Sequence, residues 1–124
     1  MIQEKDILVR QLKAAMRLLA RLLKLKDNEI DFETYSDEDL ELVNLSTVKN
    51  LLDNNVLNST QYDLAKTLLQ LNFIRNKSLF ANAIISKNDY KAFKNEWELL
   101  LTELENKSGV FDFELQELKD EDNV

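Results

Sequence analysis

The 124-residue chain has no proline, no cysteine and no histidine, and it contains a single glycine, Gly109. Without cysteine there can be no disulfides, thiolate metal ligands or cysteine nucleophiles. Without histidine, the commonest general base and the commonest transition-metal ligand are both missing. Sheets and tight turns usually depend on glycine and proline for their special backbone angles, so the scarcity of both favours helices. We therefore expect an all-α protein.

The residue types that remain do not form a recognisable catalytic pattern. General acid–base catalysis would depend on Asp, Glu, Lys and Tyr alone, and the sequence has neither a glycine-rich phosphate loop nor a nucleophile elbow. Among 23 acidic residues, some carboxylate pair will lie at a glycosidase-like separation by chance. We predict that the protein is not an enzyme and holds no cofactor or metal. A carboxylate-based enzyme or a ligand-binding bundle is the third functional class to consider, after a protein-interaction module and a membrane-associated protein.

Charge is divided unequally along the chain. Residues 1–26 carry seven Lys or Arg against two Asp or Glu, whereas the remainder carries nine against 21. The net charge of −7 argues against nucleic acid as a partner, because its binding needs a concentrated positive surface. Cations interrupt the apolar stretch 7–25, which is therefore too charged for a membrane span or the core of a signal peptide. We expect a cytoplasmic protein.

Residues 3–25 are predicted to form a basic amphipathic helix. Its cations fall on one stripe about 80° wide on a helical wheel, and apolar side chains cover more than half of the circumference. A surface helix needs a narrower apolar face, so we expect this helix to be central in the fold, to lie in an oligomer interface or to face a membrane. The predicted contact residues are Leu8, Leu12, Met16, Leu19 and Leu23, with Arg10, Arg17 and Arg21 selecting an acidic counterpart.

The rest of the chain is predicted to contain an acidic linker over 27–35, a helical body over 36–119 and a polar tail over 120–124, within one domain. Three helix starts share one pattern: an apolar residue, then Ser or Asn at the N-cap, then Asp or Gln three residues later. The three N-caps are Ser36, Asn58 and Ser86.

These signals define the expected helices of the body. We predict helices over 37–53, 59–84 and 87–107, the second of them bent or interrupted at 76–78, and the third ended by a left-handed Gly109. A short last helix starts at Asp112 and buries Phe113, Leu115 and Leu118. Short links favour antiparallel packing, so the four to five helices should form hairpins or a small bundle.

Two further groups of residues have a functional and a structural interpretation. Acidic residues 27, 29, 31 and 33 fall at alternate positions of an EF-hand-like register, but Phe32 occupies the position where glycine permits the sharp turn. We therefore expect solvated linker acids. The aromatic residues Tyr90, Phe93 and Trp97 follow helical spacing, and we expect a core face rather than a ligand slot.

The first residues also carry a resemblance. The segment EKDILVRQL at 4–12, continued by LLARLL at 18–23, resembles the start of a family of small bacterial helical proteins of unknown function. In that family, Asp-aromatic-x-x-Arg precedes an amphipathic helix rich in Leu, Ala and Arg; here Ile7 replaces the aromatic residue. The resemblance implies an all-helical bacterial domain and assigns no functional residue.

These observations favour a non-catalytic protein-interaction or scaffolding module. We expect a homo-oligomer formed through the N-terminal helix, or docking of that helix on an acidic surface of another protein. The alternative is a peripheral membrane-associated protein that uses the same basic helix, although the helix has no Trp or Phe to place at the membrane interface.

Overall fold

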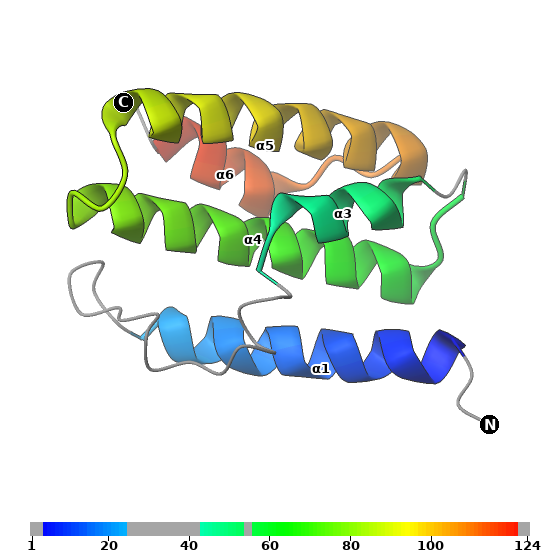
Figure 1. The fold of residues 1–124 in the computed structure, drawn as a ribbon. Helices are drawn as coiled ribbons and strands as arrows, with labels where there is room; N and C mark the ends of the chain where they lie inside the picture. Colours follow the sequence, from blue (N-terminus) through cyan, green and yellow to red (C-terminus); the bar gives the residue numbers. More distant parts are fainter. Residues whose placement is uncertain (1–3, 25–42, 54–55, 122–124) are drawn as a thin grey trace.

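The computed structural model describes residues 4–24, 43–53 and 56–121. These ranges contain five helices and no strand, which confirms the predicted all-α bundle. Figure 1 shows α3 and α5 running opposite to α4, whereas α1 and α6 run in the same direction as α4. The helices are α1 (Glu4–Leu22), α3 (Leu45–Leu52), α4 (Ser59–Ala81), α5 (Lys87–Ser108) and α6 (Phe113–Glu121).

Helix α4 is the centre of the bundle. The helices α1, α3, α5 and α6 all pack against it, and in Figure 1 it lies between α1 and the other three. Because neighbours cover it on several sides, its buried residues are spread around the helix instead of lying on one face. The hydrophobic periodicity of the sequence therefore does not identify α4 as the central helix. Its buried residues are Leu64, Ala65, Thr67, Leu68, Leu69, Leu71, Asn72, Phe73 and Ser78.

Helix α1 lies at the edge of the bundle, so the first of its three expected settings, the centre of the fold, is wrong. It packs mainly against α4 and buries Ala15, Leu18 and Leu22. The apolar face predicted from the sequence is wider than the strip that α4 covers. The remaining apolar side chains of α1 are therefore at the margin of the core or in solvent.

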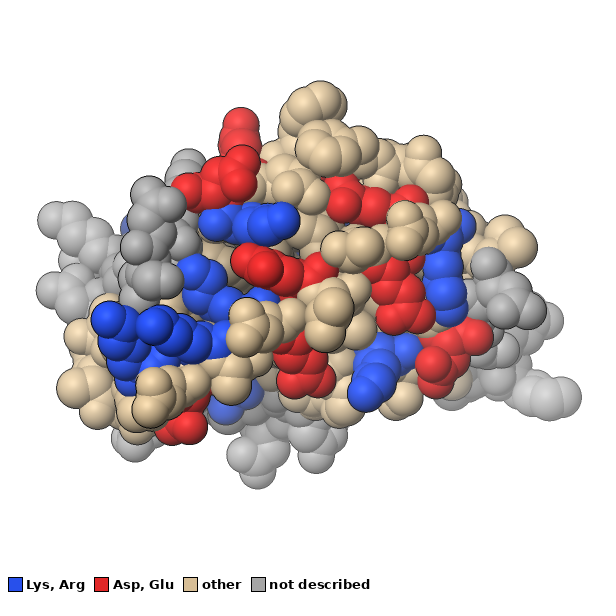
Figure 2. All heavy atoms as spheres, turned by 90° about the horizontal axis from the view of Figure 1, so that it is seen from above, with Lys and Arg blue, Asp and Glu red and all other residues tan. Residues whose placement is uncertain are grey.

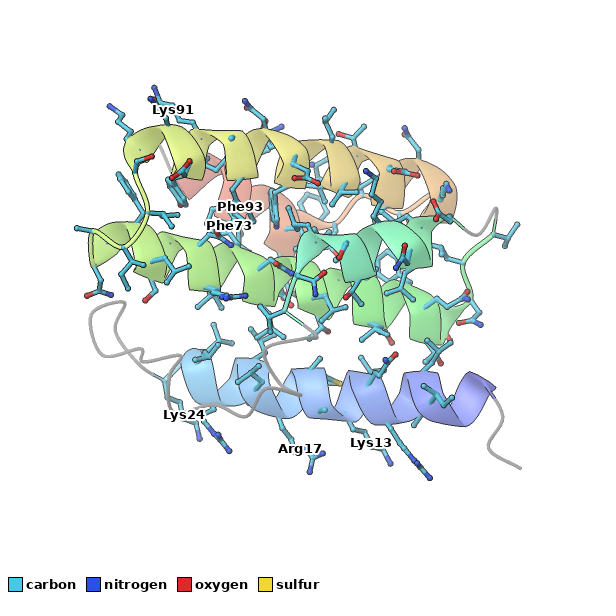
Figure 3. The ribbon with its side chains drawn as sticks, in the orientation of Figure 1. Lys13, Arg17, Lys24, Phe73, Lys91 and Phe93 are labelled. Atoms are coloured by element: carbon cyan, nitrogen blue, oxygen red, sulfur yellow. The ribbon has the colours of Figure 1, made fainter. Side chains whose placement is uncertain are left out.

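The α4–α5 hairpin holds the aromatic core. Trp97 is fully buried, and its Nε1 donates a hydrogen bond to the backbone oxygen of Leu69 at 2.8 Å. The ring of Phe73 meets the Trp97 ring edge-on with centroids 5.0 Å apart, and Figure 3 shows Phe73 and Phe93 between the two helices. Tyr90 is also fully buried. The predicted core role of this aromatic series is confirmed.

Two of the three predicted N-caps are confirmed. The Asn58 side chain accepts from the Gln61 backbone N–H while Gln61 accepts from that of Asn58, a complete capping box. The Ser86 hydroxyl accepts from the Asp89 backbone N–H at 3.0 Å. The third N-cap, Ser36, and the acidic linker over 27–35 lie outside the described residues.

Helix α4 is continuous through residues 76–78, where a bend or an interruption was predicted, and it ends at Ala81 rather than at 84. The end is set by Ala83, whose φ of 58° is left-handed. The backbone N–H groups of Ala83 and Ile84 donate to the carbonyls of Phe80 and Leu79, the bonding pattern of a Schellman motif. Because a left-handed residue cannot continue a right-handed helix, α4 stops there.

The bounds of the three remaining helices of the body can also be compared with the prediction. The predicted helix over 37–53 is not continuous, because Asn44 is extended and is the N-cap of α3, accepting from the Thr47 backbone N–H. Its predicted start at residue 37 lies outside the described residues. Helix α5 ends at Ser108, and Gly109 caps it in the predicted left-handed conformation with a φ of 70°. Helix α6 continues to Glu121, two residues into the predicted polar tail.

Candidate interaction surface

The apolar residues predicted to form a contact fall on two sides of α1. Leu8, Leu12 and Leu19 pack against the margin of the core and therefore contribute to the fold. Met16 and Leu23 are 54% and 67% exposed. The structure thus leaves two of the five predicted apolar side chains available at the surface.

The predicted basic stripe faces solvent. Arg10, Lys13, Arg17, Arg21 and Lys24 are all exposed, and Figure 3 shows the side chains of Lys13, Arg17 and Lys24 pointing away from the bundle. Residues 7–24 contain no Asp or Glu, so this face carries charge of one sign. On the other side of the bundle, the face over α5 carries cations and carboxylates together (Figure 2).

A groove of about 370 Å³ lies between α1 and α4, beside the exposed flank of α1. On each helix the lining residues are spaced by three and four positions, which places them on one face of that helix. The α1 wall is apolar and the α4 wall is polar. The groove is lined by Met16, Leu19, Ala20 and Leu23 of α1 and by Asp63, Lys66, Thr67 and Gln70 of α4.

The polar wall of this groove is tied to α6 through a buried carboxylate. Asp112 is 5% exposed; its Oδ2 accepts from the Tyr62 hydroxyl at 2.6 Å and lies 3.1 Å from Lys66 Nζ. Its Oδ1 accepts from the Leu115 backbone N–H at 3.1 Å, which caps α6. Lys66 also lies 3.3 Å from Glu114, whose side chain is 68% exposed. A short helix is thereby fixed to the central one by directional bonds.

The bonds and charges of this cluster favour an ionised Asp112 and a protonated Lys66 and Tyr62. Burial acts to raise the pKa of Asp112, but the bonds from Tyr62, Leu115 and Lys66 outweigh it and hold that pKa below its ordinary value. Burial acts to lower the pKa of Lys66, but the neighbouring Asp112 and Glu114 raise it overall. The pKa of Tyr62 is raised by burial and by its bond to Asp112. A general acid or base needs a pKa near neutrality, and all three pKa values move away from it, which supports a structural role.

An aromatic pair stands exposed where the chain enters α6. Phe111 and Phe113 are 57% and 74% exposed, and their rings meet edge-on with centroids 5.0 Å apart. The prediction that Phe113 is buried with Leu115 is wrong. At the N-terminus of α6 only Leu115 is fully buried, and Phe113, two positions earlier, lies on the opposite face.

Sequence reasoning missed three parts of this surface: Ala20, the α4 wall and the aromatic pair. The spacing of Met16, Ala20 and Leu23 is a signal for the α1 wall, since it marks one flank of the apolar face. The α4 wall has no such signal, because its residues become a wall only when α1 packs beside them.

Comparison with known proteins gave no match to a protein-family model, a curated protein or a solved structure. The resemblance of residues 4–23 to a bacterial helical family and the cytoplasmic location therefore stay predictions. The acidic register at 27–33 lies outside the described residues. Within 4–24, 43–53 and 56–121, no helix has both the length and the apolar character needed to cross a bilayer.

Proposed function

We propose that the protein is a non-catalytic interaction module that associates with itself through α1. The observation that supports this most directly is the exposed flank of α1, where Met16 and Leu23 stand in solvent beside a groove with an apolar wall. Exposed apolar side chains that border a concave surface are typical of protein contact sites. The five cations next to this flank supply electrostatic selection of an acidic counterpart.

The direction of the apolar side chains favours a protein partner over a membrane. A helix that lies in a membrane interface buries its apolar face in lipid and keeps its cations at the headgroups. Here α4 covers the centre of the apolar face, through Ala15, Leu18 and Leu22. A membrane facing the stripe would meet cations such as Arg17, with exposed apolar side chains such as Met16 and Leu23 to the side of the stripe rather than at its centre.

Association is tested by measuring mass in solution. Light scattering and sedimentation of the full chain should give a mass above 14.5 kDa that rises with concentration. The double variant Met16→Ser/Leu23→Ser should shift the equilibrium to the single chain. Its matched control is Ile84→Ser/Leu99→Ser, which removes two side chains that are 67% and 72% exposed at other sites. A wild-type chain that stays at 14.5 kDa at every concentration contradicts the proposal.

The outward cations favour a second candidate, peripheral attachment to an anionic membrane. Because α4 covers the centre of the apolar face, such binding would be mainly electrostatic and would weaken strongly with salt. Flotation with vesicles containing an anionic lipid, at low and at physiological salt, separates the two candidates. Binding at low salt that weakens at physiological salt and requires Lys13 and Arg17 would favour the membrane; no flotation at either salt would remove this candidate.

A further inference from the structure

We infer that the groove between α1 and α4 receives the start of α6 from a second copy of this chain, with Phe111 and Phe113 as the inserted side chains. We call these two residues the aromatic knob. The inference rests on the proposed self-association and names the surface that α1 meets. Three observations support it: the exposure of the knob, the fit of a ring pair to the groove, and the charges around both.

The knob and the α1 wall of the groove are both apolar. The knob is an edge-on ring pair that is more than half exposed, and the groove offers an aliphatic wall that includes Met16 and Leu23. A volume of about 370 Å³ is at the lower end of concave binding sites, which suits a pair of rings rather than a whole helix. Aromatic and methionine side chains are enriched at protein interfaces, and contacts between sulfur and aromatic rings are favourable.

The charges are complementary across this contact. The helix that follows the knob exposes three carboxylates, Glu114, Glu117 and Asp120, against one cation, Lys119. The α4 wall of the groove adds one charge of each sign, Asp63 and Lys66. The outer side of α1 exposes five cations and has no acidic residue over 7–24. Figure 3 shows Lys13 and Arg17 pointing away from the bundle. Insertion of the knob therefore brings acidic residues toward basic ones.

The alternative self-contact, between two α1 helices, is electrostatically unfavourable. A symmetric α1–α1 seam places the same surface of both copies face to face. The exposed flank of α1 borders the basic stripe, so the two stripes, five cations each, would lie close together. Like charges at an interface oppose association. A knob from α6 in the α1–α4 groove avoids this repulsion.

A complementation experiment tests the inference. One variant loses the knob, through Phe111→Ser/Phe113→Ser, and the other loses the groove wall, through Met16→Ser/Leu23→Ser. Each variant alone should associate about tenfold or more weakly than wild type, because truncated central side chains usually dominate a contact. A mixture should form a 1:1 complex, since one partner supplies an intact knob and the other an intact groove. Circular dichroism melts check that both variants fold.

The outcomes separate this inference from the proposed function. A wild-type chain that never self-associates overturns both. A knob variant that still self-associates like wild type overturns the inference and leaves association through α1 in place. A mixture that forms no complex also overturns the inference.

A charge-reversal pair repeats the test without touching apolar residues. Glu117→Lys/Asp120→Lys on one chain and Lys13→Glu/Arg17→Glu on another change only exposed side chains. The first pair should weaken self-association, and mixing the two variants should restore a complex. Equal association of both variants and wild type at low salt would overturn the predicted charge contact.

Discussion

The helices α1 and α6 both pack against α4, but they are held there in different ways. Helix α1 has 19 residues and is anchored by the aliphatic side chains of Ala15, Leu18 and Leu22. Helix α6 has nine residues, and Leu115 is its fully buried anchor. Its position is fixed instead by the buried Asp112, which bonds to two residues of α4. A short helix has too little apolar area to be positioned by packing alone, and directional bonds supply what it lacks.

The aliphatic contacts of α1 and the Asp112 bonds of α6 also differ in how precisely they fix the geometry of a contact. Aliphatic packing stabilises a contact in proportion to its area and gives it little direction. A carboxylate held by Tyr62, Lys66 and a backbone N–H has one favourable geometry. We therefore expect substitutions in α1 to change stability according to burial, and substitutions at Asp112 to change it according to bonding.

The largest expected effect is at the apolar anchor of α1. Leu22→Ala should lower the free energy of unfolding by about 2–5 kcal/mol, because Leu22 is 1% exposed and its loss leaves a cavity. The neighbouring Leu23→Ala, at a residue that is 67% exposed, should cost under about 0.5 kcal/mol. Urea unfolding followed by the fluorescence of Trp97, the single tryptophan, measures both. Equal losses at the two positions would contradict the packing of α1 described above.

The next effect is at the polar anchor of α6. Asp112→Asn keeps the volume of the side chain but removes the charge, so it should cost about 1.5–3 kcal/mol, the usual range for hydrogen bonds to a charged group. Asp120→Asn on the exposed side of the same helix is the control and should be nearly neutral. The same urea experiment compares them. If Asp112→Asn were as mild as Asp120→Asn, the buried bonds would contribute little and α6 would be held by Leu115.

The pH dependence of stability isolates the charge of Asp112 more sharply. The pKa of Asp112 is lowered in the folded chain from its ordinary 3.8. The stability that it contributes is therefore fully present above pH 4 and is lost as the pH falls through the folded pKa. The difference between wild type and Asp112→Asn should shrink in acid. An unchanged difference down to pH 2 would show that its charge is not the cause.

On the alkaline side the sign is reversed. The pKa values of Lys66 and Tyr62 are both raised in the folded chain. Their contribution is present below pH 10 and is lost as the pH rises through the ordinary values of 10.5 and 10.0 and on toward the folded ones.

The smallest effects are expected at the two residues with left-handed backbone angles, Ala83 and Gly109. Gly109 sets the turn that leads from α5 to α6. Gly109→Ala should cost about 1 kcal/mol through backbone strain alone, since an added Cβ meets nothing within 4 Å. Ala83→Gly, at the end of α4, should stabilise by up to about 1 kcal/mol because it relieves the same strain. Thermal unfolding of both variants provides the test, and changes of the same sign would contradict it.

Local signals predicted the parts of the fold that depend on local bonding. Asn58, Ser86 and Gly109 mark helix ends because each interacts with backbone groups within a few residues. The start of α3 was missed although Val43 and Val48 flank the cap Asn44 in the same apolar pattern, because Thr47 stands where the other starts have Asp or Gln. A looser rule for that position would have found it.

The site depends on distant contacts, so the sequence predicted less of it. The basic stripe of α1, which includes Arg10, Arg17 and Arg21, follows from helical periodicity and was predicted. The structure adds that these side chains are exposed. The bond from Tyr62 to Asp112 joins residues 50 positions apart, and no local pattern marks them as partners. The exposure of Met16 and Leu23 follows only from how much of α1 a single neighbouring helix can cover.

The central place of α4 also decides where this chain is free to vary. In that helix only Ser59, Asp63, Lys77 and Ala81 are exposed, so nearly every replacement along it disturbs a neighbour. The outer sides of α1 and α6 tolerate replacement far better, because solvent accommodates a new side chain there. Drift or engineering that alters which molecule this chain recognises would therefore accumulate on those two outer sides, while the scaffold between them stays unchanged.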